Sequence, residues 1–285
     1  MADHAYEYET NLRLVWARYM DKSHDFRFGP VSNPFFVIWL VLQGNRKVEI
    51  NGEYFDIGAG DLVLFPPNGR YRLLPEEEPG RIVRYCSTAC EMTVGAFDLS
   101  ELFVVPPTHS NIASEPLSNL HREWREVYRA YESLAASQGD PCAETLILQA
   151  SASASLYRWF SLLMSVVRPQ PHAVSPLTDE RILRTCLQIQ QNLDRPLTLE
   201  GLSRQVFLSP SHLSYLFKQA LRMSPMAYAR KERMKQAKQL LLNTSLTIRE
   251  IGERVGCADQ GQFSRLFRSA EGCSPLQYRR RRTAY

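Results

Sequence analysis

Residues 199–218 read LEGLSRQVFLSPSHLSYLFK, and residues 248–268 read IREIGERVGCADQGQFSRLFR. The two stretches are copies of one pattern, because apolar residues recur at matching places and a Ser-Pro…Tyr motif follows each, SPMAY at 224–228 and SPLQY at 274–278. The second copy is one residue longer in its middle. Each copy predicts a helix, a tight turn and a second helix, and two such units on a basic background are typical of a protein that reads duplex DNA at two places.

Residues that favour helix N-caps stand where these helices are expected to begin. Thr198 can cap the first helix of the first copy, and Thr247 with Glu250 has the form of a capping box in the second. Ser209 and Asp259 stand before the second helix of each copy. The local signals therefore agree with the helix-turn-helix interpretation.

The second helix of each copy has an apolar face and a polar face. The spacing i, i+3, i+4 predicts a core face formed by Leu213, Leu216 and Phe217 in the first copy and by Phe263, Leu266 and Phe267 in the second. The polar faces predict contacts to DNA bases from Ser211, Ser214, Tyr215, Gln260, Gln262 and Arg265, and contacts to phosphates from Lys218 and Arg268. An ordinary solvated face is the alternative for these polar residues.

The C-terminal part of the chain resembles the DNA-binding domain of the AraC/XylS family of bacterial transcription regulators. The resemblance covers residues 178–285. Its matching positions include Arg233, Ala237, Leu240 and Leu241, and the sequence GCSP at residues 272–275. It implies that a helix over residues 226–242 holds the two recognition helices about one turn of DNA apart, so that they face successive major grooves.

Two residues depart from the family pattern. Arg222 stands where a glycine usually ends the first recognition helix, and Cys257 stands where an aromatic residue usually follows Gly256. If position 222 is left-handed, an arginine there costs about 1 kcal/mol. Both departures bear on local stability rather than on function.

Charge is unevenly placed along the 285 residues. Residues 178–285 carry 19 Lys and Arg against 9 Asp and Glu, a net +10, whereas residues 1–177 carry 15 against 21, a net −6. A basic C-terminal part on an acidic body predicts that one domain meets phosphate and the other does not. We expect three parts: a ligand-binding and dimerisation domain at 1–167, a proline-containing linker at 168–177 and the DNA-binding domain at 178–285.

The N-terminal part predicts short strands separated by turns. Asn51-Gly52 between residues 47–50 and 53–57 indicates a two-residue hairpin with a type I′ turn. The stretch around it resembles the cupin-like barrel that many AraC-type regulators carry. The expected fold class is therefore α+β: a cupin-like β-barrel with a C-terminal helical pair, then an all-α domain of two helix-turn-helix motifs joined by a linker helix.

A small-molecule effector is expected in the barrel. Aromatic and arginine side chains on or beside the predicted strands would suit a sugar or an anionic metabolite, with a packed interior and solvated arginines as the alternative; they are Trp39, Tyr54, Tyr71, Arg72, Arg84 and Tyr85. Histidine is absent between His24 and His109, which argues against a metal-dependent cupin enzyme. We expect no cofactor, no metal and no enzymatic activity.

The six cysteines are scattered without a C-x-x-C pair, no signal peptide opens the chain, and the longest apolar run, residues 35–42, is too short to span a bilayer. These features favour a reducing, cytoplasmic setting. Cys86 and Cys90 share one parity on a predicted strand and could form a thiol sensor or part of a metal site, with buried inert thiols as the alternative.

A row of apolar residues with heptad-like spacing follows the barrel and comprises Leu117, Leu120, Trp124, Val127, Tyr131 and Leu134. The row is either a dimer interface or a helix face packed on the chain's own barrel. The resemblance favours the dimer interface. We expect a ligand-responsive, homodimeric transcription regulator that binds double-stranded promoter DNA, activates transcription with RNA polymerase as a partner, and senses a metabolite such as a carbohydrate. The rival functions are a thiol redox-sensing regulator and a cupin enzyme fused to a DNA-binding domain.

Overall fold

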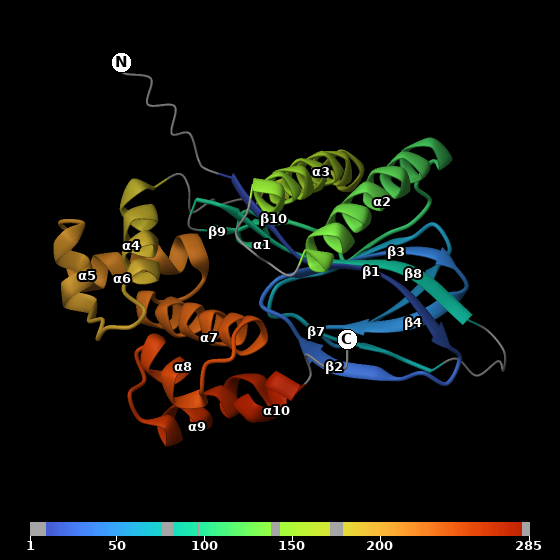
Figure 1. The fold of residues 1–285 in the computed structure, drawn as a ribbon. Helices are drawn as coiled ribbons and strands as arrows, with labels where there is room; N and C mark the ends of the chain where they lie inside the picture. The colour runs from blue at the N-terminus through green and yellow to red at the C-terminus, as the bar shows by residue number, and fades with distance from the viewer. Residues whose placement is uncertain (1–9, 76–81, 96, 138–142, 172–178, 281–285) are drawn as a thin grey trace, which may run out of the picture. The chain divides into compact units, whose positions relative to one another are not determined.

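The computed structural model describes residues 10–75, 82–95, 97–137, 143–171 and 179–280. The chain divides into two compact units, the N-terminal unit (residues 1–171) and the C-terminal unit (residues 172–285). The first combines antiparallel sheets with two long helices, and the second is helical, so the α+β prediction is confirmed (Figure 1). Residues 172–178, which hold most of the predicted linker, lie outside the described residues.

Two larger sheets and one two-stranded sheet lie in the described part of the N-terminal unit. The first has the order β1-β8-β3-β6-β11 with β9 beside β8, and its strands are β1 (Thr10–Ser23), β8 (Ile82–Val94), β3 (Phe36–Gln43), β6 (Leu62–Phe65), β11 (Thr108–His109) and β9 (Phe97–Asp98). The second has the order β2-β7-β4-β5, with β2 (Phe28–Ser32), β7 (Arg70–Leu73), β4 (Asn45–Ile50) and β5 (Glu53–Gly58). The hairpin of β4 and β5 turns through Asn51 and Gly52, both at positive φ, as the Asn-Gly signal predicts.

The helices of this unit cover the outer face of the first sheet. Helix α1 (Leu99–Leu102) precedes β10 (Phe103–Val104), which pairs with β12 (Gln170–Pro171), and the long helices are α2 (Ser114–Ala136) and α3 (Ala143–Val167). Strand β3 is buried on both faces because alternate residues point into two different cores. Phe36, Ile38 and Leu40 pack in one core with residues of α2 and α3. On the other face, Trp39 meets Tyr71 of the second sheet, with ring centroids 6.4 Å apart.

The row of α2 proposed as a dimer interface lies in the chain's own core, so that prediction is wrong for its central residues. Leu120, Trp124 and Val127 are at most 1% exposed in a single chain, and Leu117 and Tyr131 pack against the same core. The Trp124 indole Nε1 donates to Thr88 Oγ1 of β8. Leu134 is half-buried. Because α2 lies across the sheet, its apolar stripe is already covered before any partner could reach it.

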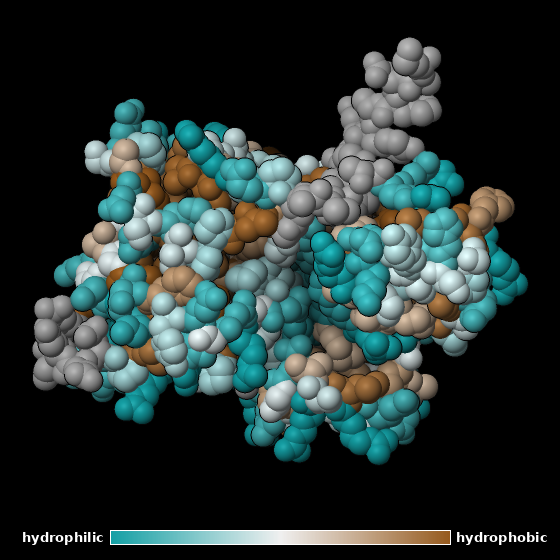
Figure 2. Space-filling model, turned by 180° about the vertical axis from the view of Figure 1, so that it is seen from behind, coloured by the Kyte–Doolittle hydropathy of each residue, from teal (hydrophilic) through white to brown (hydrophobic). Residues whose placement is uncertain are grey.

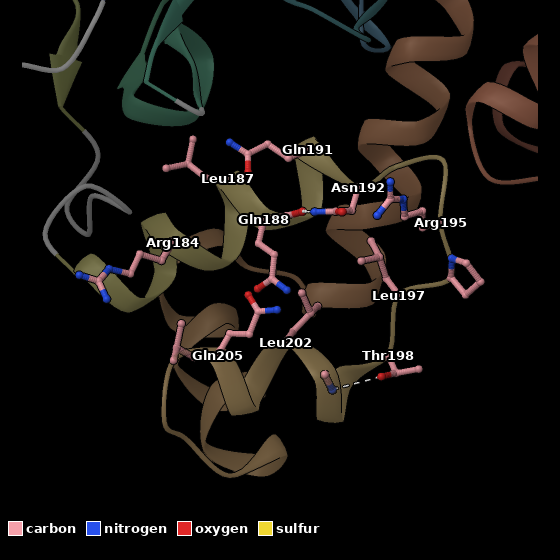
Figure 3. Close-up of a pocket in the computed structure, with 13 residues that line it drawn as sticks. Arg184, Leu187, Gln188, Gln191, Asn192, Arg195, Leu197, Thr198, Leu202 and Gln205 are labelled. Atoms are coloured by element: carbon pink, nitrogen blue, oxygen red, sulfur yellow. Dashed lines mark hydrogen bonds between the residues drawn. The ribbon is translucent and has the colours of Figure 1, made fainter.

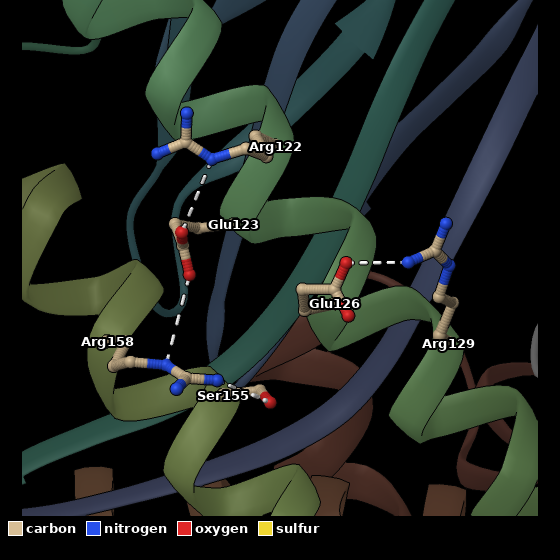
Figure 4. A network of polar contacts seen from close by, with 6 residues as sticks. All are labelled: Arg122, Glu123, Glu126, Arg129, Ser155 and Arg158. Atoms are coloured by element: carbon tan, nitrogen blue, oxygen red, sulfur yellow. Dashed lines mark hydrogen bonds and ion pairs between the residues drawn. The ribbon is translucent and has the colours of Figure 1, made fainter.

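The outer surface of the two long helices carries charged side chains (Figure 4). Glu123 of α2 lies 3.6 Å from Arg122 Nε and 3.8 Å from Arg158 Nε of α3, and Arg129 pairs with Glu126 at 2.6 Å. The arginines are largely exposed and the glutamates partly exposed, so each pair contributes roughly 0–1 kcal/mol. The helix pair is therefore held mainly by its buried face.

Seven helices form the C-terminal unit, as far as the described residues show: α4 (Glu180–Gln191), α5 (Leu199–Gln205), α6 (Pro210–Leu221), α7 (Pro225–Asn243), α8 (Ile248–Arg254), α9 (Gln260–Glu271) and α10 (Pro275–Arg280). The repeat in the sequence is a repeat in the packing. Phe217 makes an edge contact with Tyr228 at 5.7 Å, and Phe267 makes the same contact with Tyr278 at 5.4 Å. Helix α7 is the predicted connection between the two copies.

The predicted caps are present. The side chains of Thr198, Ser209 and Asp259 accept hydrogen bonds from backbone amides in the first turns of α5, α6 and α9. Thr247 and Glu250 form a reciprocal capping box at α8.

The predicted core faces of α6 and α9 are narrower than the spacing suggested. Leu213, Phe217, Phe263 and Phe267 are fully buried, whereas Leu216 is half-buried and Leu266 is 47% exposed. The prediction that Leu266 is core is therefore wrong.

Both copies have left-handed residues at the same two positions, but the residue types at these positions differ. The turn after the first helix is left-handed at Phe207 (φ 56°) in the first copy and at Gly256 (φ 71°) in the second. The end of the recognition helix is left-handed at Arg222 (φ 58°) and at Gly272 (φ 72°). Glycine adopts this conformation freely, but a side chain with a Cβ strains it. The first copy therefore carries strain at two places where the second has none.

Replacing Trp124 with aspartate should unfold the N-terminal unit rather than release folded monomers. The change buries a charge and removes an indole, which costs at least about 3 kcal/mol. Thermal denaturation followed by near-ultraviolet circular dichroism measures it, with Ser133→Asp on an exposed position of the same helix as the control. A folded monomeric variant from a dimeric parent would show instead that this row joins protomers.

Replacing Arg222 with glycine should stabilise the C-terminal unit by about 1 kcal/mol, because it removes left-handed strain. Gly272→Ala is the matched reverse change, since a Cβ there meets no atom within 4 Å and the effect is conformational. The midpoint of urea denaturation, followed by far-ultraviolet circular dichroism, should rise for Arg222→Gly and fall for Gly272→Ala. An unchanged or lower midpoint for Arg222→Gly would contradict the strain.

Candidate nucleic-acid interface

Helix α6 presents a polar face away from the core of the C-terminal unit. Ser211, Tyr215 and Lys218 are exposed at spacings of four and three residues, with Tyr215 at 61% exposure, while Ser214 is half-buried beside them. Ser209 at the N-cap and Pro210 at the first helical position fix where the helix begins. These four proposed contact residues therefore share one side of a short, well-defined helix.

Helix α9 presents the corresponding face of the second copy. Gln260, Gln262, Arg265 and Arg268 are all exposed, and the last three recur every third residue. Guanidinium and carboxamide groups can form bidentate hydrogen bonds with guanine and adenine in the major groove. The face opposes the buried Phe263 and Phe267, so the side chains that reach outward are set by those that pack inward.

Cys257, one of the departures from the family pattern, lies beside this face. Its Sγ is 3.7 Å from Gln262 Oε1 and 3.7 Å from the backbone carbonyl of Asp259. The thiol donates weakly to both oxygens, which helps to orient the Gln262 carboxamide at the first turn of α9. Burial, followed by the charge of Asp259, raises the pKa of Cys257 above its ordinary value.

The end of α9 is tied to α7 by a buried ion pair that sequence reasoning missed. Lys238 Nζ lies 2.9 Å from Glu271 Oε1, and both side chains are almost fully buried. Burial lowers the pKa of Lys238, and the Glu271 carboxylate opposes that change. A signal was available: Lys238 lies four residues after Met234 and three before Leu241, on the apolar stripe of the predicted helix.

A groove of about 620 Å³ lies between α4 and α5 (Figure 3). Its lining includes Leu197 and Leu202 together with amide side chains such as Gln188 and Gln205, which point toward each other (Figure 3). Arg184 and Arg195 stand at its rim, and each is near an acidic neighbour, Glu180 at 2.5 Å and Asp194 at 3.7 Å. The groove is lined by α4, α5 and the segment between them, and not by α6.

The six residues proposed for an effector pocket do not converge. Trp39, Tyr71 and Tyr85 are 3% exposed and point between the two sheets, where Trp39 lies 4.3 Å from Tyr85 by ring centroids. Arg72 and Arg84 point to the opposite faces of their strands, because neighbouring residues alternate.

The two arginines are paired on the surface. Arg72 binds Glu49 at 2.5 Å and Arg84 binds Asp21 at 2.7 Å. Tyr54 is 58% exposed, and its hydroxyl is 3.4 Å from Arg72 Nη2. The assignment of Arg72, Arg84 and Tyr54 to one pocket with the buried aromatic residues is therefore wrong.

The thiols of Cys86 and Cys90 are buried on the side of β8 that faces the helices. Burial raises the pKa of both well above the ordinary value, which keeps them protonated and poorly nucleophilic. Four residues of strand separate them by about 13 Å, too far for a disulfide. Among the described residues no group of His, Cys, Asp or Glu could hold a metal ion, and no helix there is long and apolar enough to cross a membrane.

Polar side chains dominate the face of the molecule seen in Figure 2, with apolar residues in scattered patches between them. Large exposed apolar side chains include Leu146 and Ile147 of α3, each 67% exposed, and Phe207, which is 92% exposed. Single exposed apolar residues are ordinary on a protein surface, and Leu146 and Ile147 are adjacent in the chain.

Comparison with known proteins agrees with both units. The AraC-like ligand binding domain matches residues 15–150, and a helix-turn-helix domain matches residues 202–281. The arabinose operon regulatory protein of Salmonella typhimurium is 28% identical over 272 residues, covering 88% of this chain and 85% of that protein. The RCS-specific HTH-type transcriptional activator RclR of Escherichia coli is 27% identical over 250 residues, covering 84% and 82%.

Solved structures of one protein are similar along almost the whole chain. ToxT from Vibrio cholerae, bound to an unsaturated fatty acid, has a TM-score of 0.52 and 15% identity, and the match covers 98% of this chain and 97% of that one. At this identity the likeness concerns the fold. The two matched domains and the full-length relatives are those of regulators and not of enzymes, and the chain belongs to the AraC family of transcription regulators, with a ligand-binding N-terminal domain and a helix-turn-helix DNA-binding domain.

Proposed function

We propose that the protein binds promoter DNA by inserting α6 and α9 into two successive major grooves, under the control of a small metabolite held by the N-terminal unit. The observation that carries the proposal is the repeated pair of capped helices with matching polar faces on one helical unit. Its net charge of +10 over residues 178–285 supplies the attraction for phosphate. Base-edge contacts come from the residues named for α6 and α9, and phosphate contacts from Lys218 and Arg268.

The family and the relatives support a proposal for the class of effector. The N-terminal unit matches a ligand-binding domain, and one relative of nearly full length regulates an arabinose operon. A small polar metabolite, with a carbohydrate as the first class to test, is therefore the proposed effector. Another relative is named as an activator, which favours activation and contact with RNA polymerase here. The ligand acts by binding one arrangement of the protein more tightly than another.

Selection of bound sequences from a random duplex library tests the DNA-binding proposal. The expected product is a site with two short conserved blocks about one helical turn, roughly 10 base pairs, apart for each DNA-binding unit. Enrichment of a single block, or of none, would contradict binding in two grooves. Calorimetric titration of the full chain with sugars tests the effector class.

Replacing Arg265 with alanine should weaken binding to the selected site by about 1–3 kcal/mol and spare random DNA, since a base contact is lost. Lys218→Ala should weaken both and flatten the dependence of log affinity on log salt concentration by about one unit. Fluorescence anisotropy titrations at several salt concentrations separate the two patterns, with Arg158→Ala in the N-terminal unit as the control. Equal losses on both DNAs for Arg265→Ala would reassign it to phosphate.

We infer that a homodimer forms through α3 and not through the buried row of α2. Leu146 and Ile147 are the large apolar side chains of α3 that lie most open to solvent. A charge in an apolar interface is strongly destabilising, so Leu146→Asp should convert dimers to folded monomers. Sedimentation velocity measures the mass, and Gln149→Glu on the same helix is the exposed control. A variant that remains dimeric would exclude this face.

A further inference from the structure

The two DNA-reading halves of the C-terminal unit are joined in more than one place. Helix α7 runs from one to the other, with Tyr228 packed on the first copy and Leu241 in the core of the second. A second connection lies off the axis of α7, where the segment between α4 and α5 approaches the turn of the second helix-turn-helix. A single helix leaves bending and twisting open, whereas a second contact away from its axis opposes both.

Arg233 of α7 holds the segment after α4 by two hydrogen bonds. Its Nε donates to the carbonyl oxygen of Leu193 at 3.0 Å, and its Nη2 donates to the carbonyl oxygen of Arg195 at 2.6 Å. Both carbonyls lie after the end of α4 at Gln191, outside the backbone hydrogen bonds of that helix. The planar guanidinium suits two such acceptors at once, and a lysine ammonium does not reproduce that fork.

Gly256 brings the second helix-turn-helix against this contact. A Cβ at Gly256 would lie 2.5 Å from the Leu193 carbonyl oxygen and 2.9 Å from Arg233 Nη2, so no side chain fits between them. The residue is also left-handed, with φ of 71°. The matching residue of the first copy, Phe207, has the same backbone conformation but is 92% exposed. Glycine at 256 therefore permits a close approach that the first copy does not need.

We propose that Arg233 is a positioning residue that fixes the angle and separation of α6 and α9, and so sets which spacing of DNA half-sites the protein accepts. The proposal rests on the two-groove binding proposed above. The side chain touches no base in this role. It acts by clamping the Leu193–Arg195 segment of the first half onto the Gly256 turn of the second.

The test uses the full-length protein and duplexes carrying the selected site with its two blocks at native spacing or moved apart by half a turn of DNA. Wild type should bind the displaced site about 100-fold more weakly, because the second recognition helix then faces the wrong side of the duplex. Arg233→Lys should bind the native site about tenfold more weakly than wild type does, and it should bind the displaced site only slightly more weakly than the native site. Arg230→Lys, at an exposed position of the same helix, should behave as wild type.

Distance measurements by electron paramagnetic resonance give a readout that does not require DNA. Spin labels on Gln219→Cys of α6 and Ser269→Cys of α9, both exposed positions, report the separation of the two helices in a Cys142→Ser background. The other five cysteines are buried. The distance distribution should be narrow in wild type and in Arg230→Lys and broad in Arg233→Lys, while circular dichroism stays unchanged.

The outcomes separate the two proposals. If wild type shows no dependence on spacing, binding in two grooves fails. If wild type depends on spacing and Arg233→Lys keeps the same dependence and the same narrow distribution, the role of Arg233 is overturned and two-groove binding stands.

Discussion

Neither helix-turn-helix of this protein can bury its apolar face alone, and both therefore depend on α7. Phe217 packs edge-on against Tyr228 at the start of α7, and Phe263 and Phe267 share a core with Ala237 and Leu241 near its end. The polar faces of α6 and α9 point outward because these aromatic side chains point inward. The proposed DNA-reading surface is thus a consequence of where α6 and α9 pack on α7.

In the N-terminal unit, too, one element contributes to two cores, and this element is strand β3. Phe36, Ile38 and Leu40 of β3 face the helices, and Trp39 faces the second sheet. A continuous apolar run such as residues 35–42 is what a strand covered on both sides requires. The helices close one side, and the aromatic side chains of the second sheet close the other. An effector site in this unit has to be found among groups that this packing leaves accessible.

The parts of the structure that local chemistry determines were predictable, and the parts that depend on distant neighbours were not. The caps at Thr198, Ser209, Asp259 and Thr247 follow from short-range hydrogen bonding, and the Asn51-Gly52 turn follows from backbone conformation. The apolar row of α2 was visible as a row, but its partner was not: the same spacing fits a second chain or the chain's own sheet, and the structure shows the sheet. Arg72 and Arg84 could have been separated from Tyr71 and Tyr85 by strand alternation alone. The ion pair of Lys238 could not be predicted from local sequence, because its partner Glu271 lies on another helix.

The left-handed residues of the first copy have a consequence for the order in which the unit comes apart. Phe207 and Arg222 bracket α6 and hold it at a conformational cost that Gly256 and Gly272 spare α9. The free energy needed to open α6 locally is therefore smaller than that for α9, and its amides should exchange with solvent first. The two recognition helices, although they share one sequence pattern, would then differ in residence time on DNA, with α9 bound longer and α6 binding and leaving more readily.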